Sequence, residues 1–217
     1  LIFIAYDSYA PWDDYVKIDL YYQVIGMALP FLIGLFYAIL SEQEQSAGCF
    51  QMMLMSPKKV VPFLSKLLLL LMFCAGALLV ASLLFGVAFR FGLHGKVVDL
   101  AFYPMAALVM VVSSIPLYLL HLYLSFDSNK GVSIALGIVE SVLSALFLTG
   151  LGESVWKYVP LVWPARAVAT FFAAYNGEMT ACVELKQVAC IGFFVITIGT
   201  IVYLFWACRW EGSRIAD

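Results

Sequence analysis

Long apolar stretches constrain the fold of this chain more than any other feature. Five of them, at about residues 20–40, 67–89, 100–124, 131–150 and 187–208, each hold roughly 20 or more mainly apolar residues, and a shorter one stands at residues 1–6. About 20 apolar residues in a helix cross the roughly 30 Å hydrocarbon core of a bilayer. We therefore expect an all-α integral membrane protein, a six-transmembrane-helix bundle in which residues 1–6 end a largely missing first helix.

The composition excludes several classes of protein. Hydrophobic residues make up 64% of the 217 positions and charged residues 12%, whereas soluble domains have about 45–50% apolar and 25% charged residues. We therefore expect one transmembrane domain over residues 1–217. The net charge is −2 and like charges occur at most in pairs, which argues against a nucleic-acid partner. Five cysteines without CxxC spacing and two histidines predict no metal site.

One connection, residues 151–185 before the last apolar stretch, is long and aromatic. Its apolar middle, about 16 residues from Val159 to Ala174, is too short to cross a membrane and contains two prolines. We expect one or two re-entrant or interfacial helices here, which would form an outer hairpin. The residues expected to shape it are Trp156, Pro160, Trp163 and Pro164.

The segment from Ser41 to Lys59, SEQEQSAGCFQMMLMSPKK, is amphipathic if it is helical. Pro57 would end the helix just before Lys58 and Lys59. Two interpretations are open: a juxtamembrane helix that rests on the bilayer surface, or a docking helix whose polar face engages a soluble partner. The polar face comprises Ser41, Glu44, Gln45, Gly48 and Gln51, and the apolar stripe comprises Ala47, Phe50, Met53 and Leu54.

The order of features in this segment resembles a known family. A glutamate-containing loop, a glycine, an apolar patch, a Ser-Pro pair and basic residues precede Ser65-Lys66 at the start of the next apolar stretch. This order is similar to the first cytoplasmic loop of ABC-2 type transporter permeases, above all to that of the lantibiotic (bacteriocin) immunity permeases. Six spans and a helical hairpin before the last one also agree with that family.

The resemblance implies a function and a set of partners. The chain would be the permease subunit of an exporter in the bacterial plasma membrane, paired with a second permease as a homo- or heterodimer. It would move an amphipathic or lipophilic substrate, a lantibiotic-type peptide, out of the lipid membrane. Residues 42–56 would contain the coupling helix that contacts the ABC ATPase subunits through Glu42, Glu44, Gln45, Gly48, Phe50, Gln51, Met53 and Leu54.

This chain itself lacks a nucleotide-binding motif. A Walker A loop needs the pattern G-x-x-x-x-G-K-[ST]. The Gly95-Lys96 pair has Arg90 where the first glycine should stand and Val97 where Ser or Thr should stand. We therefore expect no catalytic residue and no cofactor in this chain, with ATP and Mg bound by the partner ATPase.

A strip of small and polar residues runs along the apolar stretch at 131–150. It consists of Ser133, Gly137, Glu140 and Ser144, which share one helical face. Small residues allow close helix contact in membranes, while an ionisable residue there faces a bundle interior or a wet cavity. The strip is therefore either a packing surface or the lining of the substrate path or of the dimer seam.

Three other features bear on function. Gly26, Pro30 and Gly34 recur every four residues and predict a close helix contact or a bend. His121 lies four residues before Ser125, where we expect it at the membrane boundary. The alternatives to a permease are a membrane anchor or sensor, with 41–59 on the lipid surface, and an intramembrane enzyme that uses Glu140 or His121.

Overall fold

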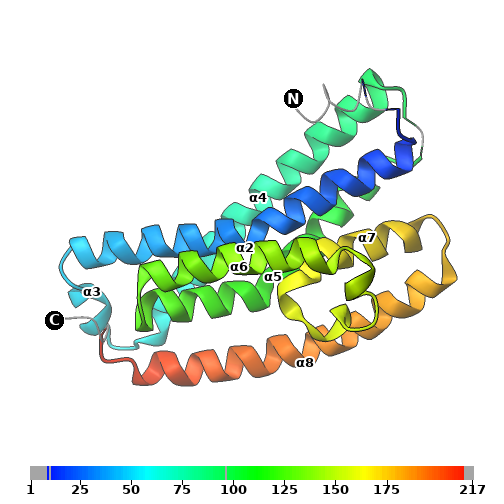
Figure 1. Ribbon diagram of the computed structural model, residues 1–217. Coiled ribbons are helices and arrows are strands. Elements are labelled where there is room, and N and C mark those ends of the chain that lie inside the picture. The colour runs from blue at the N-terminus through cyan, green and yellow to red at the C-terminus, as the bar shows by residue number, and fades with distance from the viewer. Residues whose placement is uncertain (1–8, 10, 96, 213–217) are drawn as a thin grey trace.

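The computed structural model describes residues 9, 11–95 and 97–212, so the expected helix end at residues 1–6 lies outside the described part. Its elements are α2 (Asp14–Ser46), α3 (Gln51–Leu54), α4 (Val60–Gly92), α5 (Phe102–Asp127), α6 (Lys130–Phe147), α7 (Trp163–Tyr175) and α8 (Met179–Arg209) (Figure 1). Three short 3-10 turns lie between α6 and α7, at Gly150–Gly152, Trp156–Tyr158 and Pro160–Val162.

Five of the described helices are long and apolar enough to cross a membrane: α2, α4, α5, α6 and α8. Each contains one of the five long apolar stretches, apart from the first two residues of 100–124 and the last three of 131–150. The prediction of an all-α, multi-pass membrane protein is thereby confirmed. Most helices extend past the apolar stretch, since a helix that leaves the hydrocarbon can continue through the polar interface.

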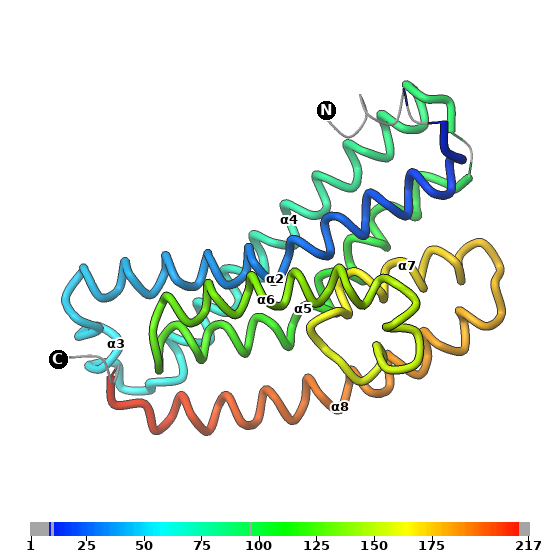
Figure 2. Tube along the Cα trace, viewed as in Figure 1, coloured from blue at the N-terminus to red at the C-terminus, as the bar shows by residue number. Residues whose placement is uncertain are grey.

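Helix α2 packs against α5, α6 and α7. Helix α6 packs along it, α7 crosses its N-terminal half, and α5 contacts both α2 and α4 (Figure 2). Its two halves are inclined to each other (Figure 1), with Pro30 near the middle of the helix. Proline removes one backbone hydrogen bond and is a common cause of such bends.

Glycines set the closest contacts of α2. A Cβ atom on Gly26 would lie 2.5 Å from the Cα atom of Ala165 in α7, and one on Gly34 would lie 2.6 Å from the carbonyl oxygen of Ser133 in α6. From the other side, a Cβ on Gly137 would lie 2.9 Å from the carbonyl oxygen of Pro30. The close contact and the bend predicted from the four-residue spacing are both present.

The expected outer hairpin contains one α-helix among the described residues, α7. Pro160 opens the last 3-10 turn and Pro164 stands in the first turn of α7, the position that proline tolerates best. Gly177, with a φ of +93°, reverses the chain into α8, which begins at Met179 rather than near residue 187. The N-terminal end of α8 therefore forms the second arm. A re-entrant position of this hairpin in the bilayer stays a prediction.

The two tryptophans of the hairpin are buried. Trp156 and Trp163 are 2% and 1% exposed and pack with Val162 and Val188. The indole of Trp163 donates a hydrogen bond to the carbonyl oxygen of Lys157 at 3.2 Å, which satisfies its polar atom. The hairpin thus carries a small core of its own next to the start of α8.

Candidate functional site

The segment between α2 and α4 is divided instead of forming one helix over residues 42–56. Helix α2 continues to Ser46, and α3 spans only Gln51–Leu54. Between them Gly48, Cys49 and Phe50 have φ angles of +137°, +50° and +64°. Left-handed backbone ends an α-helix, and glycine adopts it at little cost. The prediction of a single amphipathic helix was wrong because it continued the helical periodicity across this break.

Aromatic contacts anchor the divided segment to the bundle. Phe50 is 6% exposed, and its ring centroid lies 5.8 Å from that of Phe126 in α5 and 5.6 Å from that of Trp210 after α8. Phe63 of α4 contacts the same two rings at 5.5 and 5.1 Å. Met53 is also buried. A non-glycine residue in left-handed conformation is strained, and these contacts hold Phe50 there.

Hydrogen bonds reinforce this anchor. The indole of Trp210 donates to the carbonyl oxygen of Phe126 at 3.2 Å, and the amine of Lys59 donates to the carbonyl oxygen of Trp210 at 2.8 Å. The indole of Trp206 donates to the carboxylate of Asp127 at 3.0 Å. The connection is thus fastened to α4, α5 and α8 together.

Two of the expected docking residues form ion pairs within the chain. Glu44 pairs with Lys66 of α4, and Glu42 pairs with Lys130 of α6. The first pair is largely shielded, whereas the side chains of the second are about half exposed. Exposed pairs contribute little to stability. Glu44 therefore joins α2 to α4, while Glu42 keeps much of its surface available.

The exposed side of the segment includes two residues absent from the expected set. Met52 and Met55 are each 80% exposed, beside the exposed Gln51 and Leu54. The outer surface is thus formed by Gln45, Gln51, Met52, Leu54 and Met55, and we call it the α3 surface. Exposed methionines are flexible apolar contacts that adapt to partner surfaces. Correct placement of the break at Gly48 would have revealed them from the sequence.

A buried polar network connects α2, α5 and α6. The Nε2 atom of His121 lies 2.8 Å from a carboxylate oxygen of Glu140, and its Nδ1 atom lies 2.9 Å from the hydroxyl of Ser133. That hydroxyl donates to the carbonyl oxygen of Gly34 at 3.2 Å. His121 and Ser133 are 0% exposed and Glu140 is 3% exposed.

This network places the side chain of His121 inside the bundle, and its position at a membrane boundary stays a prediction. The sequence contained a signal for this burial: α5 and α6 are antiparallel and joined by a short turn at Asn129, whose side chain accepts a hydrogen bond from the backbone N–H of Gly131. Residues at equal distances from such a turn meet. His121 therefore faces the stretch of α6 between Ser133 and Glu140.

The small-residue strip lies at the contact between α6 and α2 of the same chain. Ser133, Gly137, Glu140 and Ser144 are all buried. Beside them, the backbone N–H of Phe31 donates to the hydroxyl of Ser141 at 3.2 Å, at the proline bend of α2. This geometry is that of a packing surface. A role for the strip in the substrate path or at a dimer seam stays a prediction.

The network contains the groups of an acid–base catalyst, but a substrate cannot reach them in this conformation. A serine next to a histidine that contacts a carboxylate is the arrangement of many hydrolases. Here the hydroxyl of Ser133 is buried and donates to Gly34. A substrate carbonyl could reach it only if α2 moved away. In this conformation the network holds helices together.

The fold and these two sites define the class of protein as an all-α, multi-pass membrane protein. Comparison of the chain with protein-family models, with curated proteins and with solved structures found no match. Within the described ranges, no group of three or more His, Cys, Asp or Glu side chains is placed to hold a metal ion.

Proposed function

We propose that this chain is the transmembrane subunit of an ABC exporter of the ABC-2 type. The observation that carries the proposal is the construction of the α3 surface. Its outer side presents Met52 and Met55 to solvent, while on its inner side Met53 is buried and Phe50 packs against Phe126 of α5 and Trp210 after α8. A surface built in this way can receive a push from a soluble partner and transmit it into the bundle.

The same contacts favour a docking element over a lipid-surface anchor. An interfacial anchor uses free lysines to attract lipid phosphates. Lys59 is engaged with the carbonyl oxygen of Trp210, and Lys66 is engaged with Glu44. Of the lysines near α3, Lys58 is exposed. The α3 surface is thus poor in available positive charge and rich in adaptable apolar side chains.

In the proposed mechanism, ATP and Mg bind to separate ATPase subunits, and closure of these subunits moves α3. The motion passes through Phe50 to α5 and α8, and two permease copies shift against each other. The permease would have six spans, as the resemblance implies, and an outer hairpin formed by α7 and the start of α8. By family resemblance the membrane is the bacterial plasma membrane and the exported substrate is an amphipathic peptide of the lantibiotic type.

Co-purification tests the proposal. The tagged chain is expressed with the genes that neighbour its own, solubilised in mild detergent and assayed for bound ATP-hydrolysing subunits. We expect the wild type to retain an ATPase and the double variant Met52→Glu, Met55→Glu to lose at least 90% of it. Met179→Glu is the matched control, because Met179 is 78% exposed and starts α8, in the hairpin rather than the α3 surface.

Either of two results would contradict the proposal: a wild-type chain that retains no ATPase, or equal retention by the double variant and the wild type. Proper folding of both variants is checked by size-exclusion chromatography in the same detergent. Loss of the ATPase in the Met179→Glu control as well would show a general effect of added charge rather than a specific surface.

An intramembrane enzyme is the alternative that a specific observation favours, namely the contact of Ser133 with His121 and of His121 with Glu140. A membrane-permeant fluorophosphonate tests it, because this reagent labels serine nucleophiles activated by a neighbouring base. Under the exporter proposal Ser133 stays unlabelled. Labelling that disappears in Ser133→Ala would favour the enzyme.

A further inference from the structure

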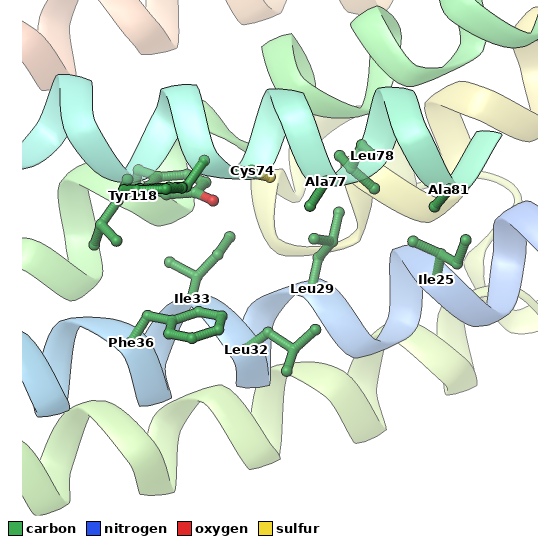
Figure 3. Close-up of a pocket in the computed structure, with 12 residues that line it drawn as sticks. Ile25, Leu29, Leu32, Ile33, Phe36, Cys74, Ala77, Leu78, Ala81 and Tyr118 are labelled. Atoms are coloured by element: carbon green, nitrogen blue, oxygen red, sulfur yellow. The ribbon is translucent and has the colours of Figure 1, made fainter. Parts of the chain in front are cut away.

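A cavity of about 500 Å³ lies between α2 and α4. Side chains from both helices point into it, including Leu29 and Ile33 from α2 and Ala77 and Leu78 from α4 (Figure 3). Its volume falls within the range of about 300–1,000 Å³ that small-molecule sites occupy. The cavity is therefore large enough to hold a small ligand.

The cavity exists because α2 and α4 are joined near both ends and separated between them. Near one end the hydroxyl of Tyr21 donates to the carbonyl oxygen of Ala81 at 2.9 Å, and the Tyr21 ring stacks on Phe85 with centroids 3.8 Å apart. Near the other end Glu44 pairs with Lys66. The two helices thus frame a space that neither fills.

The lining is almost entirely apolar. Ten of the twelve lining residues are aliphatic or Phe, and the other two are Tyr118 and Cys74. The Tyr118 hydroxyl and the Cys74 thiol are the two side-chain polar groups of the lining, and no charged side chain lines the space. A phosphate, a sugar or a peptide backbone would lose most of its hydration here without compensation.

The mouth of the cavity faces the hydrocarbon of the bilayer. Eleven of the twelve lining residues fall at 25–36 and 70–81, near the middle of α2 (Asp14–Ser46) and of α4 (Val60–Gly92), and the twelfth is Tyr118 of α5. Exposed side chains rim the opening, with Phe36 52% and Phe73 69% exposed. At that depth the surrounding medium is lipid tails rather than water. An empty apolar space there would forfeit dispersion contacts on its walls.

We propose that this cavity binds one acyl chain of a membrane lipid, inserted sideways between α2 and α4 while its headgroup remains at the interface. The depth, the lipid-facing mouth and the apolar lining carry this inference. It does not depend on the exporter proposal, because it follows from the position of the cavity in a membrane-spanning bundle. Bound lipid would fill the space between the two end contacts of α2 and α4.

Photo-crosslinking in vesicles tests the site. The full chain is reconstituted in phosphatidylcholine that carries a diazirine midway along one acyl chain, irradiated, digested and mapped by mass spectrometry. We expect adducts to be concentrated at 29–36 and 70–81. Ala77→Trp, which fills the cavity, should lower labelling of these segments at least fivefold.

Matched variants separate occupancy from general lipid contact. Leu84→Trp adds the same ring on α4, at a residue that is 66% exposed and outside the cavity, and should leave labelling of 29–36 and 70–81 unchanged. Ala77→Leu fills less of the space and should lower labelling about twofold, which covers the case in which the tryptophan variant fails to fold. Size-exclusion chromatography in detergent checks that each variant is folded.

Three results would overturn the proposal. The first is labelling that is equally dense on exposed lipid-facing segments such as 193–202 of α8. The second is labelling of the cavity segments that Ala77→Trp and Ala77→Leu leave unchanged. The third is efficient crosslinking of Cys74 between two chains by a short bismaleimide, without acyl adducts, which would identify a second copy as the occupant. Cys190, exposed on α8, is the control position for that reaction.

Discussion

Helix α2 is packed tightly on one side and loosely on another, and the difference comes from side-chain size. Towards α6 it presents Gly34, and α6 presents Gly137, so the backbones come close and a polar network fits between the helices. Towards α4 it presents Leu29 and Ile33, and a cavity remains. In a bilayer no hydrophobic effect drives helices together, so close contact depends on small residues and hydrogen bonds.

The glycines of α4 show the contrast from the other side. A Cβ atom on Gly76 would meet nothing within 4 Å, so this glycine in the middle of α4 brings no neighbouring backbone close. Gly137 has backbone atoms of α2 within 3.0 Å of the same position. The presence of a glycine therefore does not indicate a contact unless a partner helix uses the space.

Among the variants that test this difference in packing, Gly137→Leu is expected to have the largest effect on stability. The added side chain collides with the backbone of α2 at Pro30 and Phe31, which cannot move aside as a side chain can. Overpacking costs about 1–3 kcal/mol, and we expect about 3 kcal/mol of lost unfolding free energy here. Reversible unfolding in mixed detergent micelles measures it. Gly76→Leu is the control and should change stability by less than about 1 kcal/mol; equal losses in both variants would refute the asymmetry.

The next effect concerns the polar network on the tight side. Glu140→Ala removes the carboxylate partner of His121, and we expect a loss of about 1–2 kcal/mol, the upper range for hydrogen bonds between membrane helices. A double-mutant cycle with His121→Ala isolates the pair; a coupling energy near zero would show that the contact does not stabilise the bundle. Glu140→Gln also addresses transport: normal export by this variant would eliminate a charged substrate path and leave the packing role.

A filling substitution on the loose side sharpens the comparison. Ala77→Leu points into the cavity, so we expect a change in unfolding free energy between zero and a gain of about 1 kcal/mol, in contrast to the loss at Gly137. The same unfolding assay in lipid-free detergent measures it. A loss above about 1 kcal/mol would mean that α2 and α4 are packed as tightly as α2 and α6.

The smallest effects are expected at the ion pairs near the C-terminal end of α2, which join this helix to α4 and to α6. The coupling energy of Glu44 with Lys66 should be about 0.5–1 kcal/mol, because these side chains are 26% and 13% exposed. That of Glu42 with Lys130, 56% and 47% exposed, should be about 0.3 kcal/mol or less and should vanish in high salt. Double-mutant cycles with Gln and Met replacements measure both, and the reverse order would show that exposure does not govern these pairs.

Much of the fold could be predicted from the sequence, and the candidate sites less so. The five long helices follow from apolar stretches whose length matches a bilayer. The spacing of Gly26, Pro30 and Gly34 in α2 predicted a close contact or a bend, and the structure has both. One particular prediction failed, the single helix over 42–56, and the burial of His121, Trp156 and Trp163 was not predicted. Each of these depends on which other segment lies alongside.

The failed prediction and the unpredicted burial have a common physical cause. Phe50 adopts a left-handed conformation because Phe126 and Trp210, distant in sequence, surround its ring. Trp156 and Trp163 are buried because the hairpin folds onto the start of α8. Local propensity disfavours the left-handed backbone of Phe50, and tertiary packing supplies the free energy that overrides it.

The sequence by itself determined that the protein lies in a lipid bilayer. It also determined the number and position of the described long helices and the small residues that allow close packing. These properties depend on composition and on periodicity along one helix, which neighbouring segments do not alter. Only the tertiary structure decided which faces meet, and hence the meeting of His121 with Glu140, the outward position of Met52 and Met55, and the cavity between α2 and α4. Such contacts join residues far apart in the chain, and no pattern within a single helix specifies its partner.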